Sequence, residues 1–256
     1  MSSQAKVLGV IPARYASSRF PGKPLARIHG KTMIQRVYEQ AQQAKGLGGL
    51  VVATDDERIH REVKRFGGQV RMTREDHESG TARLTEVATY YPEATHFLNI
   101  QGDEPYLHPD QLDQLIQTLL EQNTELATLA RPLRRVQDLQ SPHVVKVVLG
   151  EHGQALYFSR AALPYCRDED NPSQWLAQPH YFHHVGLYGF TRRALMSYAS
   201  LNPSPLESLE KLEQLRWLAH GYVIKVGITN WHAQAIDTPT DLEYLVHEAI
   251  PDWVRK

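Results

Sequence analysis

Residues 10–31, "VIPARYASSRFPGKPLARIHGK", form a run of cations that contains no carboxylate. Its positive side chains are Arg14, Arg19, Lys23, Arg27 and Lys31. Clustered cations repel one another unless an anion is present, and Arg and Lys are the side chains that best grip phosphate groups. The run therefore predicts a polyphosphate site, with a solvated basic face as the alternative.

This loop is not a Walker A loop, because that motif requires G-x-x-x-x-G-K-[ST]. Ser17 stands at the first glycine position, and Pro24 replaces the hydroxyl residue after Lys23. Pro24 also disfavours helix at Lys23. We expect Pro21 and Gly22 to turn the backbone so that Lys23 points back over the end of the preceding strand.

Two aspartates are candidate ligands of Mg²⁺, an ion that prefers oxygen and bridges substrate phosphates. Asp103 follows Gly102 at the end of the apolar stretch 95–103, and Glu104 could orient that loop. Asp237 lies just before a predicted helix that starts at 239. The alternatives are that Asp103 caps a turn and that Asp237 only interacts with the helix dipole.

Composition narrows the function further. The net formal charge of −1 gives no basic field for nucleic acid. The single cysteine, Cys166, excludes an intramolecular disulfide framework and suits a reducing cytoplasm. No apolar run is long enough for a signal peptide or a membrane span. "HYFHH" (180–184) lacks the pattern of a zinc site, and no G-x-S-x-G nucleophile motif is present.

Strands and helices alternate in the first half of the chain, which predicts an α/β protein with a mainly parallel, Rossmann-like central sheet. Strands are expected at 6–12, 49–54, 69–73 and 95–103, with helices between them. Parallel sheets bind ligands at the carboxyl ends of their strands. The predicted site loops are therefore 13–31, 73–81 and 101–106.

The second half of the chain does not show this regular alternation. We expect a hairpin at 143–159, a polar loop at 166–181, a strand at 183–190 and a helix near 192–201. One helix is predicted over 205–219, with a core face formed by Leu206, Leu209, Leu212, Leu215 and Leu218. Ser204 and Thr238 start capping boxes. The chain is interpreted as one domain, 1–256, in which 131–190 is an inserted hairpin or lid subregion.

The motifs together carry a family resemblance. They are "VIPARYASSRFPGKPL", "VVATDDERI", "MTREDHESGTARLTEV", "NIQGDEP", "VKVVLGEHGQALYFSRAALPY", "HHVGLYGF", "LESLEKLEQLRWL" and "IDTPTDLEYL". In this order they resemble the 3-deoxy-manno-octulosonate (KDO) cytidylyltransferases. The resemblance implies a nucleotide-diphospho-sugar transferase fold, Mg²⁺ dependence and a homodimer that uses 131–190 for dimerisation and sugar binding. It implies the transfer of CMP from CTP to the anomeric 2-hydroxyl of KDO, with release of pyrophosphate, for lipopolysaccharide biosynthesis.

The resemblance also assigns residues. The family's phosphate-binding side chains fall on Arg14 and Lys23, with Arg19 in the same loop, and its metal ligands fall on Asp103 and Asp237. Its cytosine side falls on Thr73, Arg74, Ser79, Gly80 and Thr81. Its sugar side falls on Gln101, Arg160, His184, Tyr188, Glu213 and Gln214. The alternatives are the same reaction on an amino-substituted KDO or another acidic sugar, a non-catalytic nucleotide-binding protein, and a glycosyltransferase.

Overall fold

The computed structural model describes residues 5–17 and 19–254. Its strands are β1 (Val7–Ala13), β2 (Arg27–Ile28), β3 (Lys31–Thr32), β4 (Gly49–Thr54), β5 (Val70–Met72), β6 (His96–Asn99), β7 (Leu126–Pro132), β8 (Lys146–Leu149), β9 (Ala155–Ser159), β10 (Phe182–Thr191) and β11 (Ile224–Ile228). Its α-helices are α1 (Met33–Ala41), α2 (Glu57–Arg65), α3 (Gly80–Tyr90), α4 (Pro109–Leu119), α5 (Val136–Gln140), α6 (Pro172–Trp175), α7 (Arg192–Ser197), α8 (Pro205–Glu210), α9 (Gln214–Ala219) and α10 (Pro239–His247). Its 3₁₀ turns are η1 (Lys23–Leu25), η2 (Tyr198–Ser200) and η3 (Asp252–Val254). Within these residues, no helix combines the length and the apolar character needed to cross a bilayer.

The central sheet has the strand order β11-β7-β10-β6-β1-β4-β5. β10 lies antiparallel between β6 and β7, and the remaining neighbours on this path are parallel. All these strands except β10 therefore run in one direction, and their carboxyl ends meet at one edge of the sheet, as the sequence predicted. The antiparallel β10 places its first residues, including His184, at this same edge.

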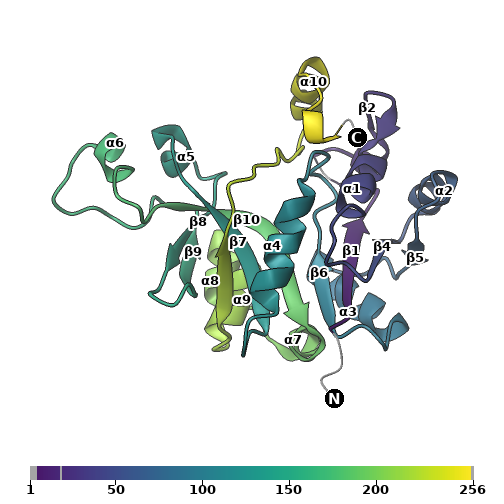
Figure 1. The fold of residues 1–256 in the computed structure, drawn as a ribbon, viewed down its shortest axis with the longest axis horizontal. Helices are drawn as coiled ribbons and strands as arrows, with labels where there is room; N and C mark the ends of the chain where they lie inside the picture. The colour runs from purple at the N-terminus through teal and green to yellow at the C-terminus, as the bar shows by residue number, and fades with distance from the viewer. Residues whose placement is uncertain (1–4, 18, 255–256) are drawn as a thin grey trace.

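Helices cover both faces of the sheet, which explains why β1 is buried along most of its length. One core packs α1, α2 and α4 against the sheet, with Val37, Ile59 and Leu112 among its members. The other core packs α3, α7 and α9 on the opposite face, where Trp217 is buried. Figure 1 shows α1 and α4 on one side of the strands, and α7 and α9 at the lower end of the molecule.

The predicted hairpin is confirmed as β8–β9, which joins the central sheet through β10. Beyond β9 the chain leaves the body as an arm that carries α6, at the left of Figure 1. The predicted polar loop at 166–181 thus contains a helical turn whose Trp175 is buried with Leu133, Leu139 and Tyr181. The predicted subregion 131–190 also includes β10, which is an integral strand of the sheet.

The prediction of one helix over 205–219 is wrong. Lys211 adopts a left-handed backbone conformation with φ of 53°, so α8 ends at Glu210 and α9 begins at Gln214. Because the chain turns there, the apolar stripe does not continue across the break. Leu206 and Leu209 are exposed, whereas Leu212 and Leu215 are buried as predicted.

Candidate active site

The basic loop after β1 is held by a turn at Gly22, whose φ of 73° favours glycine. The Gly22 N–H donates to the carbonyl of Tyr15 at 2.9 Å, which closes the loop on itself. The short turn η1 then begins at Lys23, and the buried Pro24 is its second residue. Lys23 is directed back toward the strand ends, as predicted, although it begins a 3₁₀ turn.

Lys23 joins the two aspartates that were predicted as metal ligands. Its Nζ lies 2.7 Å from Asp103 Oδ2 and 3.6 Å from Asp237 Oδ1, and it also donates to the carbonyl of Ile236 at 2.8 Å. Arg19 donates to Asp237 Oδ1 at 3.1 Å. The phosphate-binding and metal-binding residues therefore meet at one point, where two carboxylates already hold a cation between them.

The aspartates reach this point from distant parts of the chain. Asp103 follows β6, where Gly102 passes so near β1 that an added Cβ would lie 3.1 Å from the carbonyl of Pro12. Asp237 is brought in by the buried Ile236, which packs with Ile28, Met33, Tyr106 and Leu245. The Ile236 N–H donates to the carbonyl of Asp103 at 2.9 Å, so the two segments are joined directly.

A predicted capping box fixes the approach of Asp237. Asp241 Oδ2 accepts from the N–H groups of Asp237 and Thr238 and from the Thr238 hydroxyl, and Thr238 Oγ1 accepts from the Asp241 N–H. The side chains of Asp241 and Thr238 are therefore occupied in capping the turn that starts α10. The Asp237 carboxylate is left to face Lys23 and Arg19.

Glu104, next to Asp103, has a different character. Its side chain is buried, and Oε2 has no hydrogen-bond partner among the described residues. Burial, with the nearby Asp103 adding to the effect, raises the pKa of Glu104 to about 8. Glu104 is therefore held as a neutral acid at pH 7, and it does not add a third negative charge to the pair.

A cavity of about 410 Å³ opens at this edge of the sheet. It is lined by Pro12, Ala13, Arg14, Ala16, Ser17, Arg19, Lys23, Pro24, Gln101, Gly102 and Asp103. It thus gathers every predicted phosphate-binding residue together with Gln101 and Asp103. Among the described residues, no three His, Cys, Asp or Glu side chains are grouped closely enough to hold a metal by themselves.

The predicted cytosine side divides into two groups. Ser79 caps α3 and lies 3.2 Å from the hydroxyl of Tyr198, and Gly80 packs against Asn99 at the end of β6. Arg14 donates to the carbonyl of His77 at 3.2 Å, so this loop is fastened to the phosphate-binding loop. Ser79 and Gly80 therefore lie at the strand ends beside the cavity residues.

The other residues predicted for cytosine have contacts within the fold. Thr73 is buried, and its Oγ1 accepts from the buried Arg83 at 2.5 Å. Thr81 is buried inside α3. The Arg74 side chain is exposed and its nearest carboxylate is Asp76, at 3.4 Å.

Two of the residues predicted for the sugar, His184 and Tyr188, lie on β10, and Gln101 contacts the backbone of that strand. Gln101 Nε2 donates to the carbonyl of Gly186 at 3.0 Å. His184 is buried with Nε2 at 3.0 Å from Thr128 Oγ1, and its ring lies 5.3 Å from that of Tyr188. Burial lowers the pKa of His184 to about 3, so the ring is neutral at pH 7.

The charge of Glu213 acts on two tyrosines, Tyr188 on β10 and Tyr198 beside Ser79. Burial, followed by the charge of Glu213, raises the pKa of Tyr188 well above its ordinary value and that of Tyr198 to about 12. Both tyrosines are therefore neutral hydroxyl groups at pH 7. Gln214 is buried at the start of α9, beside Glu213.

Some residues at this edge were not predicted. Asn99 is buried with an Oδ1 that has no hydrogen-bond partner among the described residues, and Tyr198 meets Ser79. A polar amide within the apolar run "FLNI" could have indicated that Asn99 lies at the site. Tyr198 gave no such signal, because an aromatic residue in a helical segment is ordinarily part of a core.

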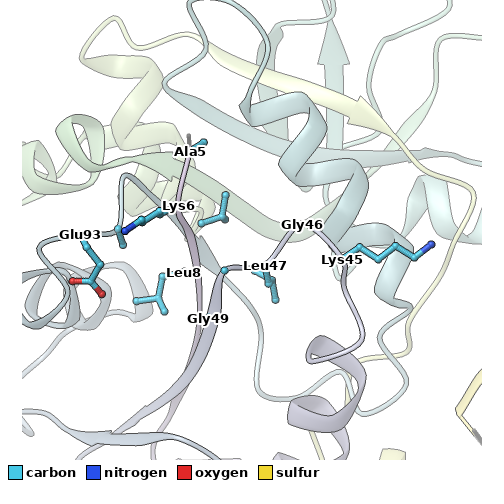
Figure 2. A pocket seen from close by; sticks show the side chains of 11 residues that line it. Ala5, Lys6, Leu8, Lys45, Gly46, Leu47, Gly49 and Glu93 are labelled. Carbon is cyan, nitrogen blue, oxygen red and sulfur yellow. The ribbon is translucent and has the colours of Figure 1, made fainter. Parts of the chain in front are cut away.

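A second pocket, of about 510 Å³, lies at the opposite edge of the sheet (Figure 2). It is formed by the amino ends of β1 and β4, with Lys6 and Glu93 on one side and Lys45 on the other. It holds none of the predicted site residues. The charged groups that could bind a nucleotide and a metal are gathered at the carboxyl edge instead.

The mainly parallel sheet covered by helices on both faces, with cations and carboxylates at its carboxyl edge, defines a Rossmann-like α/β fold. A 4-diphosphocytidyl-2C-methyl-D-erythritol synthase from Anaerococcus prevotii shares this fold, with a TM-score of 0.62 at 11% identity over 94% of this chain and 95% of that one. The cytidylyltransferase family matches residues 8–226.

Sequence relatives define the family more narrowly. The 3-deoxy-manno-octulosonate cytidylyltransferase of Syntrophotalea carbinolica is 50% identical over 92% of this chain and 95% of its own length. That of Parabacteroides distasonis is 48% identical over 93% and 96%. A CMP:2-keto-3-deoxy-manno-octonic acid synthetase, solved in complex with CTP, superposes with a TM-score of 0.88 at 42% identity, covering 94% of this chain and 97% of that one. The chain belongs to the 3-deoxy-manno-octulosonate cytidylyltransferase family.

Proposed function

We propose that this chain transfers CMP from CTP to the anomeric 2-hydroxyl of KDO and releases pyrophosphate, the activation step that precedes lipopolysaccharide assembly. The observation that carries the proposal is the convergence of Arg14, Arg19 and Lys23 with Asp103 and Asp237 at one edge of the sheet. The names of the sequence relatives and of the CTP-bound structural relative supply the substrates.

Mg²⁺ is proposed as the metal, and the residues present fit it. Asp103 and Asp237 offer carboxylate oxygens around one point, where they already contact the Lys23 ammonium. Two carboxylates suit an ion that takes its remaining ligands from water and substrate phosphates. Bound there, Mg²⁺ would neutralise phosphate charge and lower the pKa of the attacking hydroxyl.

The cations of the loop act on the triphosphate. In the reaction the KDO 2-oxygen forms a bond to the α-phosphorus, the bond from that phosphorus to the bridging oxygen breaks, and the hydroxyl proton passes to water. Arg14, Arg19 and Lys23 line the cavity and offset the charge that develops on the departing pyrophosphate. Lys23 would be available for this role when Mg²⁺ neutralises Asp103 and Asp237.

The remaining residues position the substrates. Ser79 and Gly80, at the start of α3, are proposed for the cytosine side, with Thr73, Arg74 and Thr81 in the surrounding segment. For KDO we propose six side chains, namely Gln101, Arg160, His184, Tyr188, Glu213 and Gln214. His184, neutral down to a pH of about 3, binds as an uncharged ring and is a poor proton acceptor. Chemistry of this kind depends chiefly on positioning and charge neutralisation.

We further propose a cytoplasmic homodimer. The arm between β9 and β10 extends from the body and has a small core of its own around Trp175, which supports a role in contacting a second copy. The use of CTP as a substrate supports a cytoplasmic location. Light scattering of the purified chain would test the assembly, since a monomer mass would contradict the dimer.

The test of the function is pyrophosphate release with CTP and Mg²⁺. We expect release that depends on KDO. A panel with an amino-substituted KDO and a nonulosonic acid tests the sugar, because the residues near the carboxylate could accept all three. Folded protein without KDO-dependent release would contradict the assignment.

A further inference from the structure

The guanidinium of Arg160 is held by carbonyl groups and leaves its charge unneutralised. Nε donates to the carbonyl of Glu210 at 2.7 Å, and Nη1 donates to the carbonyl of Pro142 at 2.9 Å. These contacts use two of the five N–H groups of a guanidinium. Within residues 5–17 and 19–254, Arg160 forms no ion pair with a carboxylate. A half-buried, fixed cation of this kind suits an anionic ligand.

Lys146 holds the backbone around Arg160 in place by hydrogen bonds. Its side chain is fully buried, and Nζ donates to the carbonyls of Ser141 at 2.8 Å, Val144 at 2.6 Å and Arg160 at 2.6 Å. All three donors of the ammonium are therefore used. The turn at 141–144 carries Pro142, the second anchor of the guanidinium, so Lys146 fixes both Arg160 and its anchor.

Glu210 fastens Arg160 from the other side. Its Oε2 accepts from the Arg160 N–H at 2.9 Å, and its Oε1 accepts from the Ser159 hydroxyl at 2.5 Å. Glu210 is the last residue of α8, directly before the left-handed turn that leads to Glu213. The end of β9 is thus tied to the corner between α8 and α9, which presents the residues proposed for the sugar.

We propose that Lys146 and Glu210 are positioning residues that hold the Arg160 guanidinium toward the acidic sugar. The inference rests on the proposed function, which assigns Arg160 to that substrate. Lys146, Arg160 and Glu210 together carry one net positive charge. The carboxylate of Glu210 binds the backbone N–H of Arg160 rather than its guanidinium, so it does not form a salt bridge that would occupy the guanidinium.

Steady-state kinetics of Glu210→Ala test this role. We expect the KM for KDO to rise about 10-fold or more, as for residues that orient a ligand-binding group, while the KM for CTP stays within about twofold. Glu210→Gln is expected to restore most of the affinity. Its amide oxygen can accept from the Arg160 N–H, and its NH₂ can donate to Ser159 Oγ.

Glu207→Gln is the matched control on the same helix. Glu207 pairs with Arg216 and caps α8 without contacting Arg160. It should lower Tm and leave the KM for KDO unchanged. An equal rise of that KM in Glu207→Gln would mean general loosening of the helix and would overturn the inference. If Glu210→Ala does not fold, Ser159→Ala removes one of the same contacts and should raise the KM for KDO about threefold.

The outcomes separate the two proposals. Wild-type protein whose pyrophosphate release does not depend on KDO contradicts the proposed function. A wild-type enzyme that depends on KDO, with an unchanged KM for KDO in folded Glu210→Ala, contradicts only the positioning role. Arg160→Met completes the set, because an unchanged KM for KDO in that variant would remove Arg160, and its positioning residues with it, from the sugar site.

Discussion

Replacing Lys23 by methionine removes the cation between Asp103 and Asp237. Breaking a fully buried ion pair costs about 3–5 kcal/mol. Here the side chains are 16% exposed for Lys23, 26% for Asp103 and 44% for Asp237, so water screens the unpaired carboxylates. We therefore expect a loss of about 1–2 kcal/mol in the free energy of unfolding. At about 2–4 °C per kcal/mol for a chain of this size, Tm falls by no more than about 8 °C.

The effect of Lys23→Met on turnover should be much larger than its effect on stability. Loss of one preorganised charged contact to a transition state costs about 10²–10³ in rate. Pyrophosphate release at saturating CTP and KDO measures this loss at 25 °C, where the variant remains folded. Lys31→Met is the matched control from the same run of cations, since Lys31 forms an exposed pair with Glu39 at 2.6 Å. It should change turnover by less than about twofold and stability by less than about 1 kcal/mol. Near-normal turnover in Lys23→Met would refute the reasoning.

Three further predictions follow from the described contacts. Asp103→Asn, which keeps an oxygen for Lys23, should keep its Tm within a few degrees and lose about 100-fold or more in turnover, measured by melting and pyrophosphate release; normal turnover would remove Asp103 from the metal site. The pKa of His183 is lowered to about 4 by burial and by the nearby Arg131, so its contribution to stability is complete above pH 6.5 and is lost as pH falls toward 4. In His183→Asn the side-chain oxygen can still accept from Arg131, but no imidazole titrates. As pH falls from 7.5 to 5, the free energy of unfolding measured in urea should therefore fall by about 2 kcal/mol more in the wild type than in this variant, and an identical pH profile would contradict this. Glu207→Gln should destabilise the fold by about 2 kcal/mol, because it removes the charge and one of the two acceptor oxygens of a largely buried pair with Arg216; a change below about 0.5 kcal/mol would be inconsistent with that contact.

The sequence predicts the carboxyl-edge site because its signals are local. The cation run after β1, the Gly102-Asp103 step after β6 and the capping box beside Asp237 each follow from neighbouring residues. A parallel sheet then places such loops at one edge without further information. The contact between Lys23 and both aspartates was not predictable in this way. It depends on Ile236 packing with Met33 and Tyr106, residues that are far apart in the chain.

The break between α8 and α9 shows the limit of periodicity. Leucines recur at helical spacing from Leu206 to Leu218, and the pattern alone predicts one continuous helix. Lys211 nevertheless takes a left-handed conformation, which no local signal requires of a lysine. The sharp turn lets Glu210 reach Arg160 and lets Glu213 face the tyrosines. Tertiary contacts therefore overrode local propensity at a corner of the proposed sugar site.

The fate of the α-phosphorus of CTP tests the central claim most directly. ³¹P NMR of the purified chain with CTP, Mg²⁺ and KDO should show one new phosphodiester signal, from CMP joined to the sugar, growing in step with pyrophosphate. The signal should be absent without KDO and nearly absent in Asp103→Asn. Formation of free CMP, or of no new phosphodiester by folded protein, would contradict the assignment of the chain as a KDO cytidylyltransferase.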